Sequence, residues 1–493
     1  MISESPVFAP DVTGERGVGL RSDRGPVLLS VMLSVGLVAI DSTILATAVP
    51  AVVDDLGDFA LFPWLFSIYM LAQAVSVPLY GKFADIFGRK PMMMIGVSIF
   101  LVASILCGAA WSMVSLIVFR ALQGLGAGAI MPTGQTIVAD IYSLAERARV
   151  IGYLASVWAT SSVVGPTLGG LFADYLSWRW IFFINVPIAV VAMAMLHRGF
   201  TEDVTRTTHK IDYAGAALLA AGGGLLILGL LAGGVNWAWG SPASITVLTA
   251  AALLLVAFGL VERRAAEPIL PLWMFRKRVL IGSNSVALCV GVLLIGLTSY
   301  VPLYAQNVLG TSAVVGGFAV AALTLGWPFA ATMSGRVYLR VGFRATALLG
   351  GALAITGSIV LVTVDPTSSV LRLAAGCCVL GAGLGFISAP SLVAAQASAD
   401  WQTRGTVTGA NMFARSVGSA VGIAVFGAIV NTTVTGGGPH PTAKDVPGDL
   451  LAGAIHTVFA GTLAVAVIAI LAVLIMPGGV PVDEPDPAPS AVD

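Results

Sequence analysis

The sequence predicts an all-α integral membrane protein with fourteen transmembrane helices, and composition is the first observation behind this prediction. Hydrophobic residues make up 57% of the 493-residue chain and charged residues 10%, whereas soluble domains average about 25% charged residues. So few charges cannot cover a water-soluble globule of this size, and the bilayer must therefore solvate most of the surface. The formal net charge of zero argues against a nucleic-acid partner, which would require clustered Lys and Arg on one face.

Apolar runs of spanning length are the second observation. A helix needs about 20 mostly apolar residues to cross about 30 Å of hydrocarbon at 1.5 Å per residue. The runs that meet this need lie near 26–50, 61–80, 92–111, 113–140, 149–174, 178–197, 212–233, 242–261, 279–305, 312–335, 344–364, 370–394, 405–430 and 452–476.

The distribution of Lys and Arg is the third observation. If the N-terminus is cytoplasmic, all but five of the 25 basic residues fall on the cytoplasmic side, as the positive-inside rule expects. The exceptions are Arg120 and Arg415, which lie within spans, and Arg179, Arg372 and Lys444, which lie on the other side. We therefore expect both termini to be cytoplasmic. The excess of Arg over Lys and the many Ala and Gly residues favour the cytoplasmic (inner) membrane of a bacterium.

The two ends of the chain are predicted to be cytoplasmic tails. Residues 1–25 are polar and charged and contain no short apolar run before a small-residue cleavage site, so they do not resemble a removable signal peptide. Residues 477–493 are rich in Pro and acidic residues and poor in apolar ones, which predicts a disordered tail.

An internal repeat divides the fourteen spans. The loop after the second span, 81–90, and the loop after the tenth, 335–344, both keep two glycines seven residues apart with basic residues beside them. The second copy has Leu339 where the first has Asp85. Since repeated units are a common way to build transporters, we expect a six-helix bundle at 26–197 and a linker with two extra helices at 198–261. A second six-helix bundle is expected at 262–476.

Three segments carry charged or helix-perturbing residues that stand out from the apolar spans. The loop 81–90 has Gly81 and Gly88 to permit tight turns, with Asp85, Arg89 and Lys90 at the water boundary. Arg120 lies inside the fourth span, where an arginine costs at least about 2.5–3.5 kcal/mol at the bilayer centre, so it should be paired or face a cavity. In the fifth span, small residues permit close helix packing and a proline loosens the backbone ladder; these are Gly165, Pro166, Gly169 and Gly170.

Asp41 in the first span is the only carboxylate deep within any predicted span. At 1.5 Å per residue, Asp41 lies about 5 Å from the midpoint of its span toward the non-cytoplasmic side. Arg120 lies about 10 Å from the midpoint of the fourth span in the same direction. The two side chains are therefore at similar depths, and we expect them to pair. A buried carboxylate beside an arginine can exchange a proton when its surroundings change, which makes Asp41 and Arg120 the candidate proton-coupling pair.

The loop 81–90, the stretch 120–128, the stretch 165–170 and the segments 40–50 and 178–187 together resemble the major facilitator superfamily, specifically its fourteen-span branch of drug:proton antiporters. The resemblance covers nearly the whole chain. It implies that Asp85 meets a helix N-terminus in the opposite bundle, that of the thirteenth span, and that Arg89 pairs with Asp140, so that the loop acts as a conformational switch. It also identifies 165–170 as the antiporter motif.

By this resemblance we expect a proton-coupled exporter of small lipophilic or cationic compounds, driven by the proton gradient with no cofactor and no metal. Its partners would be the small lipophilic substrate, protons and the lipid bilayer, and a monomer is expected. No Gly-x-x-x-x-Gly-Lys-Ser/Thr loop occurs, so ATP hydrolysis is not indicated. Candidate cavity residues, chosen because each puts polarity or an aromatic face deep in a span, are Tyr69, Gln73, Trp158, Tyr300, Tyr304, Trp327, Asn411 and Arg415.

Two alternatives remain open. One is an exporter of the same fold dedicated to an endogenous metabolite, such as an antibiotic, a siderophore or a lipid. The other is a membrane-embedded enzyme, which we do not expect because the sequence has no His-Glu-x-x-His pattern and its four histidines form no cluster. The four cysteines match no zinc or redox spacing and are predicted to be packing residues.

Overall fold

The computed structural model describes residues 19–57, 61–62, 64–202, 212–233, 237–265, 268–435 and 448–478. Within these ranges the regular structure is helical, apart from one isolated bridge between Gly233 and Trp237. Most of the two predicted tails and residues 203–211, near the start of the predicted linker, lie outside the described residues.

The described helices follow the predicted spans in order, and the all-α membrane fold is confirmed. They are α1 (Gly25–Leu56), α2 (Trp64–Phe87), α3 (Arg89–Gly108), α4 (Met113–Ile141), α5 (Leu144–Tyr175), α6 (Trp180–Phe183), α7 (Asn185–Gly199), α8 (Tyr213–Ala232), α9 (Pro242–Glu262), α10 (Arg278–Asn307), α11 (Ala313–Val341), α12 (Phe343–Val362), α13 (Val370–Ala397), α14 (Arg404–Thr435) and α15 (Gly448–Ile475). The short α6 and the longer α7 together occupy the sixth predicted span. Two 3₁₀ turns, η2 (Leu272–Phe275) and η3 (Trp401–Thr403), precede α10 and α14.

By length and composition, 13 segments of the described chain could cross a membrane, against fourteen predicted. The predicted span without a counterpart among them is α5, whose 32 residues are long enough but include charges in the first two turns and several Ser, Thr and Gly. Since α5 packs against α1 on one side and α11 on the other, part of its surface faces protein rather than lipid.

Local sequence explains where many helices begin. Serine side chains accept hydrogen bonds from the third helical backbone nitrogen at the starts of five helices, and these caps are Ser112, Ser143, Ser241, Ser312 and Ser369. Gly88 and Gly342 begin α3 and α12 with φ of 98° and 88°, a conformation that L side chains rarely adopt. The two glycines occupy equivalent places in the internal repeat.

Helix packing follows the same pattern in both halves of the chain. In the first half, which we call the N-terminal bundle (α1–α7), the main contacts are α3 with α4, α2 with α4, α1 with α5, α1 with α7, and α3 with α7. In the C-terminal bundle (α10–α15) they are α12 with α13, α11 with α13, α10 with α14, α10 with α15, and α12 with α15. Each pair in the second half corresponds to a pair in the first, shifted by the repeat.

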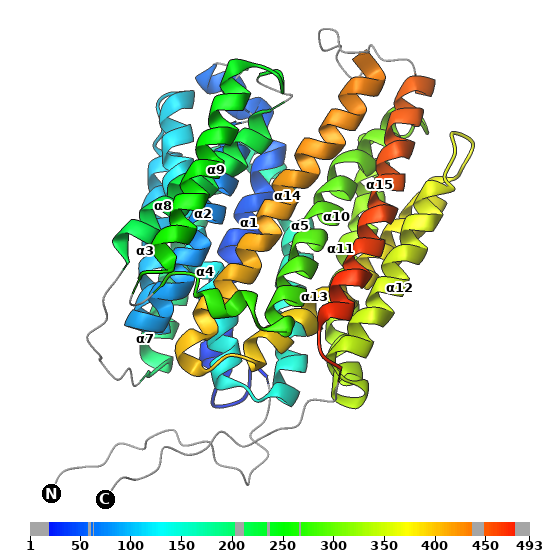
Figure 1. Ribbon diagram of the computed structural model, residues 1–493. Helices are drawn as coiled ribbons and strands as arrows, with labels where there is room; N and C mark the ends of the chain where they lie inside the picture. The colour runs from blue at the N-terminus through cyan, green and yellow to red at the C-terminus, as the bar shows by residue number, and fades with distance from the viewer. Residues whose placement is uncertain are drawn as a thin grey trace, which may run out of the picture.

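The two bundles meet along two seams, one formed by α2 and α14 and the other by α5 and α11. The extra pair α8 and α9 lies beside the first seam, where α8 contacts both α2 and α14 (Figure 1). There Ala74, Ile227 and Ala420, one residue from each of these three helices, pack in one cluster. The extra helices therefore cover the α2–α14 seam.

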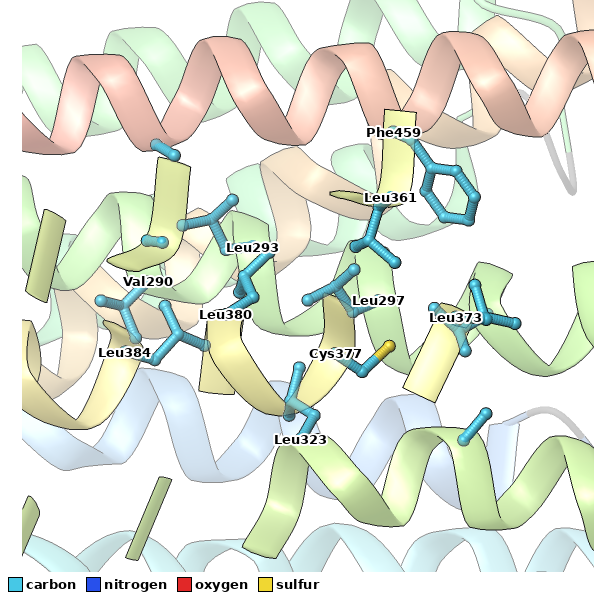
Figure 2. Packing of buried hydrophobic residues seen from close by; sticks show 14 of the residues in the cluster. Val290, Leu293, Leu297, Leu323, Leu361, Leu373, Cys377, Leu380, Leu384 and Phe459 are labelled. Atoms are coloured by element: carbon cyan, nitrogen blue, oxygen red, sulfur yellow. The ribbon is translucent and has the colours of Figure 1, made fainter. Parts of the chain in front are cut away.

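Each bundle has its own apolar core. In the C-terminal bundle, Leu293 and Leu297 of α10 lie against Leu380 of α13, with Phe459 of α15 closing one side (Figure 2). Cys377 packs among these side chains, and all four cysteines are free.

Candidate functional site

The two ends of the molecule differ in charge, and we name them accordingly. The basic end carries the loops α2–α3, α4–α5, α11–α12 and α13–α14, and the far end is the opposite one. The hydrogen bonds that the structure describes between the two bundles lie at the basic end.

Asp41 of α1 and Arg120 of α4 form a buried ion pair away from this end. The Arg120 Nη1 lies 2.6 Å from Asp41 Oδ2, and each residue is 1% exposed. Gln123 Nε2 donates to the other carboxylate oxygen, Oδ1, at 2.8 Å. Both oxygens of Asp41 are therefore held by α4.

Arg120 is satisfied by more than its carboxylate partner. Its Nη1 also donates to Gln123 Oε1 at 2.7 Å, and its Nε donates to the Leu65 carbonyl of α2 at 3.1 Å. The guanidinium carbon lies 4.1 Å from the centre of the Tyr69 ring, in cation–π geometry. This arrangement explains how an arginine is tolerated in the interior of a membrane protein.

The network extends across the N-terminal bundle through residues that sequence reasoning did not single out. Gln123 Nε2 donates to Ser104 Oγ of α3 at 2.9 Å, and Asn185 Nδ2 of α7 donates to the same oxygen at 3.3 Å. Gln123 stands within the 120–128 stretch, three residues after Arg120, so helical spacing could have indicated that the two side chains share a face.

A second cluster of charges joins the bundles at the basic end. Asp85 Oδ1 accepts a hydrogen bond from Gly405 N at 2.8 Å, and Asp85 Oδ2 accepts from Thr406 N and Thr406 Oγ1, each at 2.7 Å. Gly405 and Thr406 are in the first turn of α14, where unpaired backbone N–H groups and the helix dipole favour an anion. Asp85 thus lies at the helix N-terminus that the family resemblance implied. We call these contacts the Asp85 clasp.

Arg89 lies behind the clasp and links it to α4 and η3. Its Nε donates to Asp140 Oδ2 at 2.8 Å, and its Nη2 donates to Asp85 Oδ1 at 3.2 Å and to the Trp401 carbonyl. The guanidinium carbon also lies 3.7 Å from the centre of the Trp401 ring. Asp140 in turn accepts from Arg404 Nη1 of α14 at 2.6 Å, which adds a second charged contact across the seam.

The remaining switch-loop residues are structural partners of the clasp. A side chain at Gly81 would meet the Gly405 carbonyl at 2.5 Å, so glycine lets α2 and α14 approach closely. Lys90 Nζ donates to the His197 carbonyl at 2.8 Å. Glu202, which sequence reasoning missed, accepts from the backbone nitrogens of Arg89 and Lys90 at 2.9 Å and caps the start of α3.

Two glycines of the stretch 165–170 bring α5 against α1. Side chains at Gly165 and Gly169 would collide with Thr43 and Thr47 of α1, and Thr43 Oγ1 donates to the Ser161 carbonyl of α5 at 3.0 Å. Thr47 Oγ1 donates to the Pro166 carbonyl at 3.3 Å. Gly170 does not pack closely on a neighbouring helix, contrary to the prediction, because no atom lies within 4 Å of a Cβ added there.

The cavity candidates are spread over several environments. Tyr304 is packed inside the C-terminal bundle against Phe459, with its hydroxyl donating to the Val364 carbonyl, and Tyr300 makes an edge contact with Phe426. Both therefore have packing partners within one bundle. Of the others, Trp158 is exposed on α5, Trp327 packs partly against the C-terminal core, and Gln73 is partly buried on α2.

Asn411 and Arg415, one turn apart on α14, behave differently from each other. The Asn411 Nδ2 donates to Ser283 Oγ at 3.0 Å and to Asn284 Oδ1 at 3.4 Å, both on α10. Arg415 is partly buried, and within the described chain its guanidinium has no hydrogen bond, ion pair or ring contact.

Comparisons with known proteins agree with this architecture. Residues 31–423 match the family described as Major Facilitator Superfamily. The chain is 34% identical over 409 residues to Multidrug resistance protein 3 of Bacillus subtilis (strain 168), covering 83% of this chain and 80% of that protein. It is 31% identical over 413 residues to Multidrug transporter protein MdtP of the same organism, covering 84% and 76%.

Solved structures show a likeness of fold. The human organic anion transporter MFSD10 (TETRAN) gives a TM-score of 0.65 at 16% identity, covering 92% of this chain and 99% of that one. A bacterial homologue of ferroportin in an outward-facing state gives 0.61 at 13% identity, covering 91% and 98%. With the family matched over most of its length and the helices packed in two repeated bundles, this chain belongs to the Major Facilitator Superfamily.

Proposed function

We propose that this chain exports small lipophilic compounds in exchange for protons, as a member of the fourteen-span drug:proton antiporter branch. The buried cluster of Asp41, Arg120 and Gln123 is the observation that carries the proposal. The names of the relatives, a multidrug resistance protein and a multidrug transporter, support the cargo class. The basic end would face the cytoplasm of a bacterial inner membrane, with both termini on that side and the protein acting as a monomer.

Proton binding at Asp41 would loosen α1 from α4. A proton removes the negative charge that attracts Arg120, while Arg120 keeps its contacts with the Leu65 carbonyl, Gln123 and the Tyr69 ring. The arginine therefore stays satisfied when the carboxylate is neutral. This asymmetry suits a reversible proton site, since removing one partner of an ordinary buried ion pair costs about 3–5 kcal/mol.

Helix α1 also offers a mechanical path from the proton site to the seam. Thr43, two residues after Asp41, contacts α5 next to Gly165, and α5 packs on α11 of the other bundle. A shift of α1 would therefore move α5, one of the two helices through which the bundles meet. In the proposed cycle, protonation from the far side and cargo binding from the basic end bias the bundles toward opposite arrangements.

The test is transport by Asp41→Asn in proteoliposomes with an imposed pH gradient. We expect the variant to lose gradient-driven accumulation of a lipophilic dye, because asparagine cannot carry the proton. It should still exchange dye when the dye concentrations on both sides are equal, because the substitution leaves the binding region intact. The matched control is Asp55→Asn, which removes a carboxylate from the far end of the same helix. Full gradient-driven transport by Asp41→Asn would contradict the proposal.

The family and the fold indicate a transporter rather than an enzyme. Among the described residues, His, Cys, Asp and Glu form no group of three or more that could hold a metal ion. A cargo dedicated to one endogenous metabolite would be distinguished by competition: several chemically unrelated lipophilic dyes should compete for one multidrug site, and should not compete for a dedicated one.

A further inference from the structure

We infer that Arg415 forms a subsite for an anionic group on the cargo, so that preferred substrates are amphiphiles with an apolar body and one negative charge, such as a carboxylate or sulfonate. This inference deepens the proposed export function and rests on it.

Arg415 lies at the centre of its membrane span, on the side of α14 between α10 and the N-terminal bundle. The span runs from Trp401 to Val430, which puts Arg415 at its middle. Met412, three residues earlier, is buried among side chains of the N-terminal bundle that include Val38 and Tyr69. Asn411, four residues earlier, contacts Ser283 of α10. Since residues three and four apart are neighbours on a helix surface, Arg415 lies between these two directions, one turn further from the basic end.

Lack of a partner distinguishes Arg415 from the other deep arginine. Arg120 has a carboxylate, an amide, a backbone carbonyl and a tyrosine ring around it. Arg415 has none of these in the described chain. The hydrocarbon edge is about 15 Å from the bilayer centre, farther than an arginine side chain extends, so its charge cannot reach the interface by snorkelling. Since no group within the described residues offsets the cost of this intramembrane charge, Arg415 is a functional-site candidate.

The charge balance of the interior sets the sign of the ligand. Asp41 and Arg120 neutralise each other, and no other Asp, Glu, Lys or Arg lies in the middle of a described helix. One positive charge is therefore left over at mid-depth. A lipophilic cation would be repelled by it and an anion attracted, whereas the sequence alone suggested small lipophilic or cationic compounds as cargo.

A neutral donor, Asn284 of α10, lies beside Asn411, the residue one turn before Arg415 on α14. Asn284 accepts from Asn411 through its amide oxygen, and its amide nitrogen donates to no acceptor within the described residues. Asn411 itself is held by Ser283, which fixes this pair on α10 and α14. A guanidinium and an amide N–H₂ are the donor types that bind the oxygens of a carboxylate or sulfonate.

An anionic cargo also changes the movement of charge in antiport. If one proton enters while one anion leaves, two positive charges effectively move inward, so an inside-negative membrane potential alone drives export. With a singly charged cation the same exchange moves no net charge.

The experiment compares two probes with the same apolar body, anilinonaphthalene sulfonate and neutral phenylnaphthylamine, by titration calorimetry on the protein in nanodiscs, with empty nanodiscs as the blank. Wild-type protein should bind the sulfonate more tightly. Arg415→Gln should weaken sulfonate binding by about 10- to 100-fold, as expected for loss of a charge-assisted hydrogen bond, and change phenylnaphthylamine binding by less than about threefold. Arg415→Lys should retain most of the sulfonate affinity, and the control Arg372→Gln, at an exposed position by the start of α13, should change neither.

Equal weakening of both probes by Arg415→Gln, or equal wild-type affinity for them, would overturn the inference and leave Arg415 as a packing residue. Retained phenylnaphthylamine binding shows that a variant is folded; if Arg415→Gln binds neither probe, Arg415→Lys decides the matter, and loss of the sulfonate preference there also counts against the subsite. Binding is measured without any gradient, so a failure of proton coupling leaves this result intact, and the converse holds for the Asp41 test.

Discussion

Replacement of Asp85 by asparagine should shift the protein away from the arrangement in which the basic end is closed. The carboxylate accepts from two backbone nitrogens and one hydroxyl of α14 and from Arg89. Asparagine has only one acceptor oxygen, and its N–H₂ would be directed at N–H donors of the α14 N-terminus. The variant therefore loses the charge and part of the hydrogen bonding while keeping the size of the side chain.

The magnitude follows from these contacts. Hydrogen bonds to charged groups contribute about 1.5–3 kcal/mol each, and interaction of a carboxylate with a helix N-terminus contributes up to about 2 kcal/mol in partly buried sites. Loss of one such hydrogen bond and of the dipole interaction amounts to about 3 kcal/mol, or about 150-fold in the equilibrium between closed and open forms. A closed form populated at about 99% would then fall to about 40%.

Distances between spin labels at the basic end measure this equilibrium. Phe87 and Arg336 are exposed there, one on each bundle, and cysteines at these two positions would carry the labels. Cys378 should first be replaced by serine because it is the exposed native cysteine, whereas Cys107, Cys289 and Cys377 are buried. Asp85→Asn should add a population with a longer distance.

Glu146→Gln is the matched control, since Glu146 is also a carboxylate at the basic end but pairs with Arg24 inside the N-terminal bundle. It should leave the distance distribution unchanged. The reasoning fails if Asp85→Asn keeps the wild-type distribution, or if Glu146→Gln shifts it equally.

Three smaller predictions concern packing and pH. Gly169→Val should destabilise the protein by about 1–3 kcal/mol through overpacking of α5 on α1, whereas Gly170→Ala should have little effect, as thermal unfolding would report. Gly88→Ala should cost about 1–2 kcal/mol in the same measurement, because φ at this residue is 98°. Arg179 lowers the pKa of Asp55 below its usual 3.8, so the ion pair between these two side chains persists above pH 3.8 and is lost only at lower pH. Asp55→Asn should therefore leave the pH profile of transport near neutrality unchanged.

Apolar length and basic charge were sufficient to predict the helices because the bilayer imposes a strict length and the loops carry the topology signal. The span that composition alone does not support is α5, which places Ser161, Gly165 and Gly169 against α1. Its assignment depended on its neighbours in the chain and on the charge distribution, which are global properties of the sequence. The packing of α2 on α14 was implied only by the family resemblance, because nothing local in either helix specifies the other.

The candidate sites were predictable only in part. Asp41 and Arg120 could be paired from depth because both are rare deep charges, but Gln123 and Ser104 resembled ordinary polar residues until the helices were packed. Tyr304 was chosen for its depth, and depth does not say which face of a helix it lies on; the structure puts it in the bundle core. The sequence also could not predict that Arg415 has no partner among the described residues, because that depends on how all the helices pack.

The two seams hold the bundles together by different physical means, and the repeat explains the difference. Leu339 stands where the first copy has Asp85, and in its region Tyr338 and Val393 pack with Leu144 and Ile151 of α5. One neutral hydrogen bond crosses this seam, from the Tyr338 hydroxyl to the Leu144 carbonyl at 3.3 Å, and no charged group takes part in it. Apolar contacts are non-directional and tolerate sliding, whereas the Asp85 clasp holds only while the carboxylate reaches the first turn of α14. We therefore expect the basic end to open by release of the α2–α14 seam while α5 and α11 stay in contact, and the distance between labels on these two helices should change less than that between Phe87 and Arg336 in Asp85→Asn.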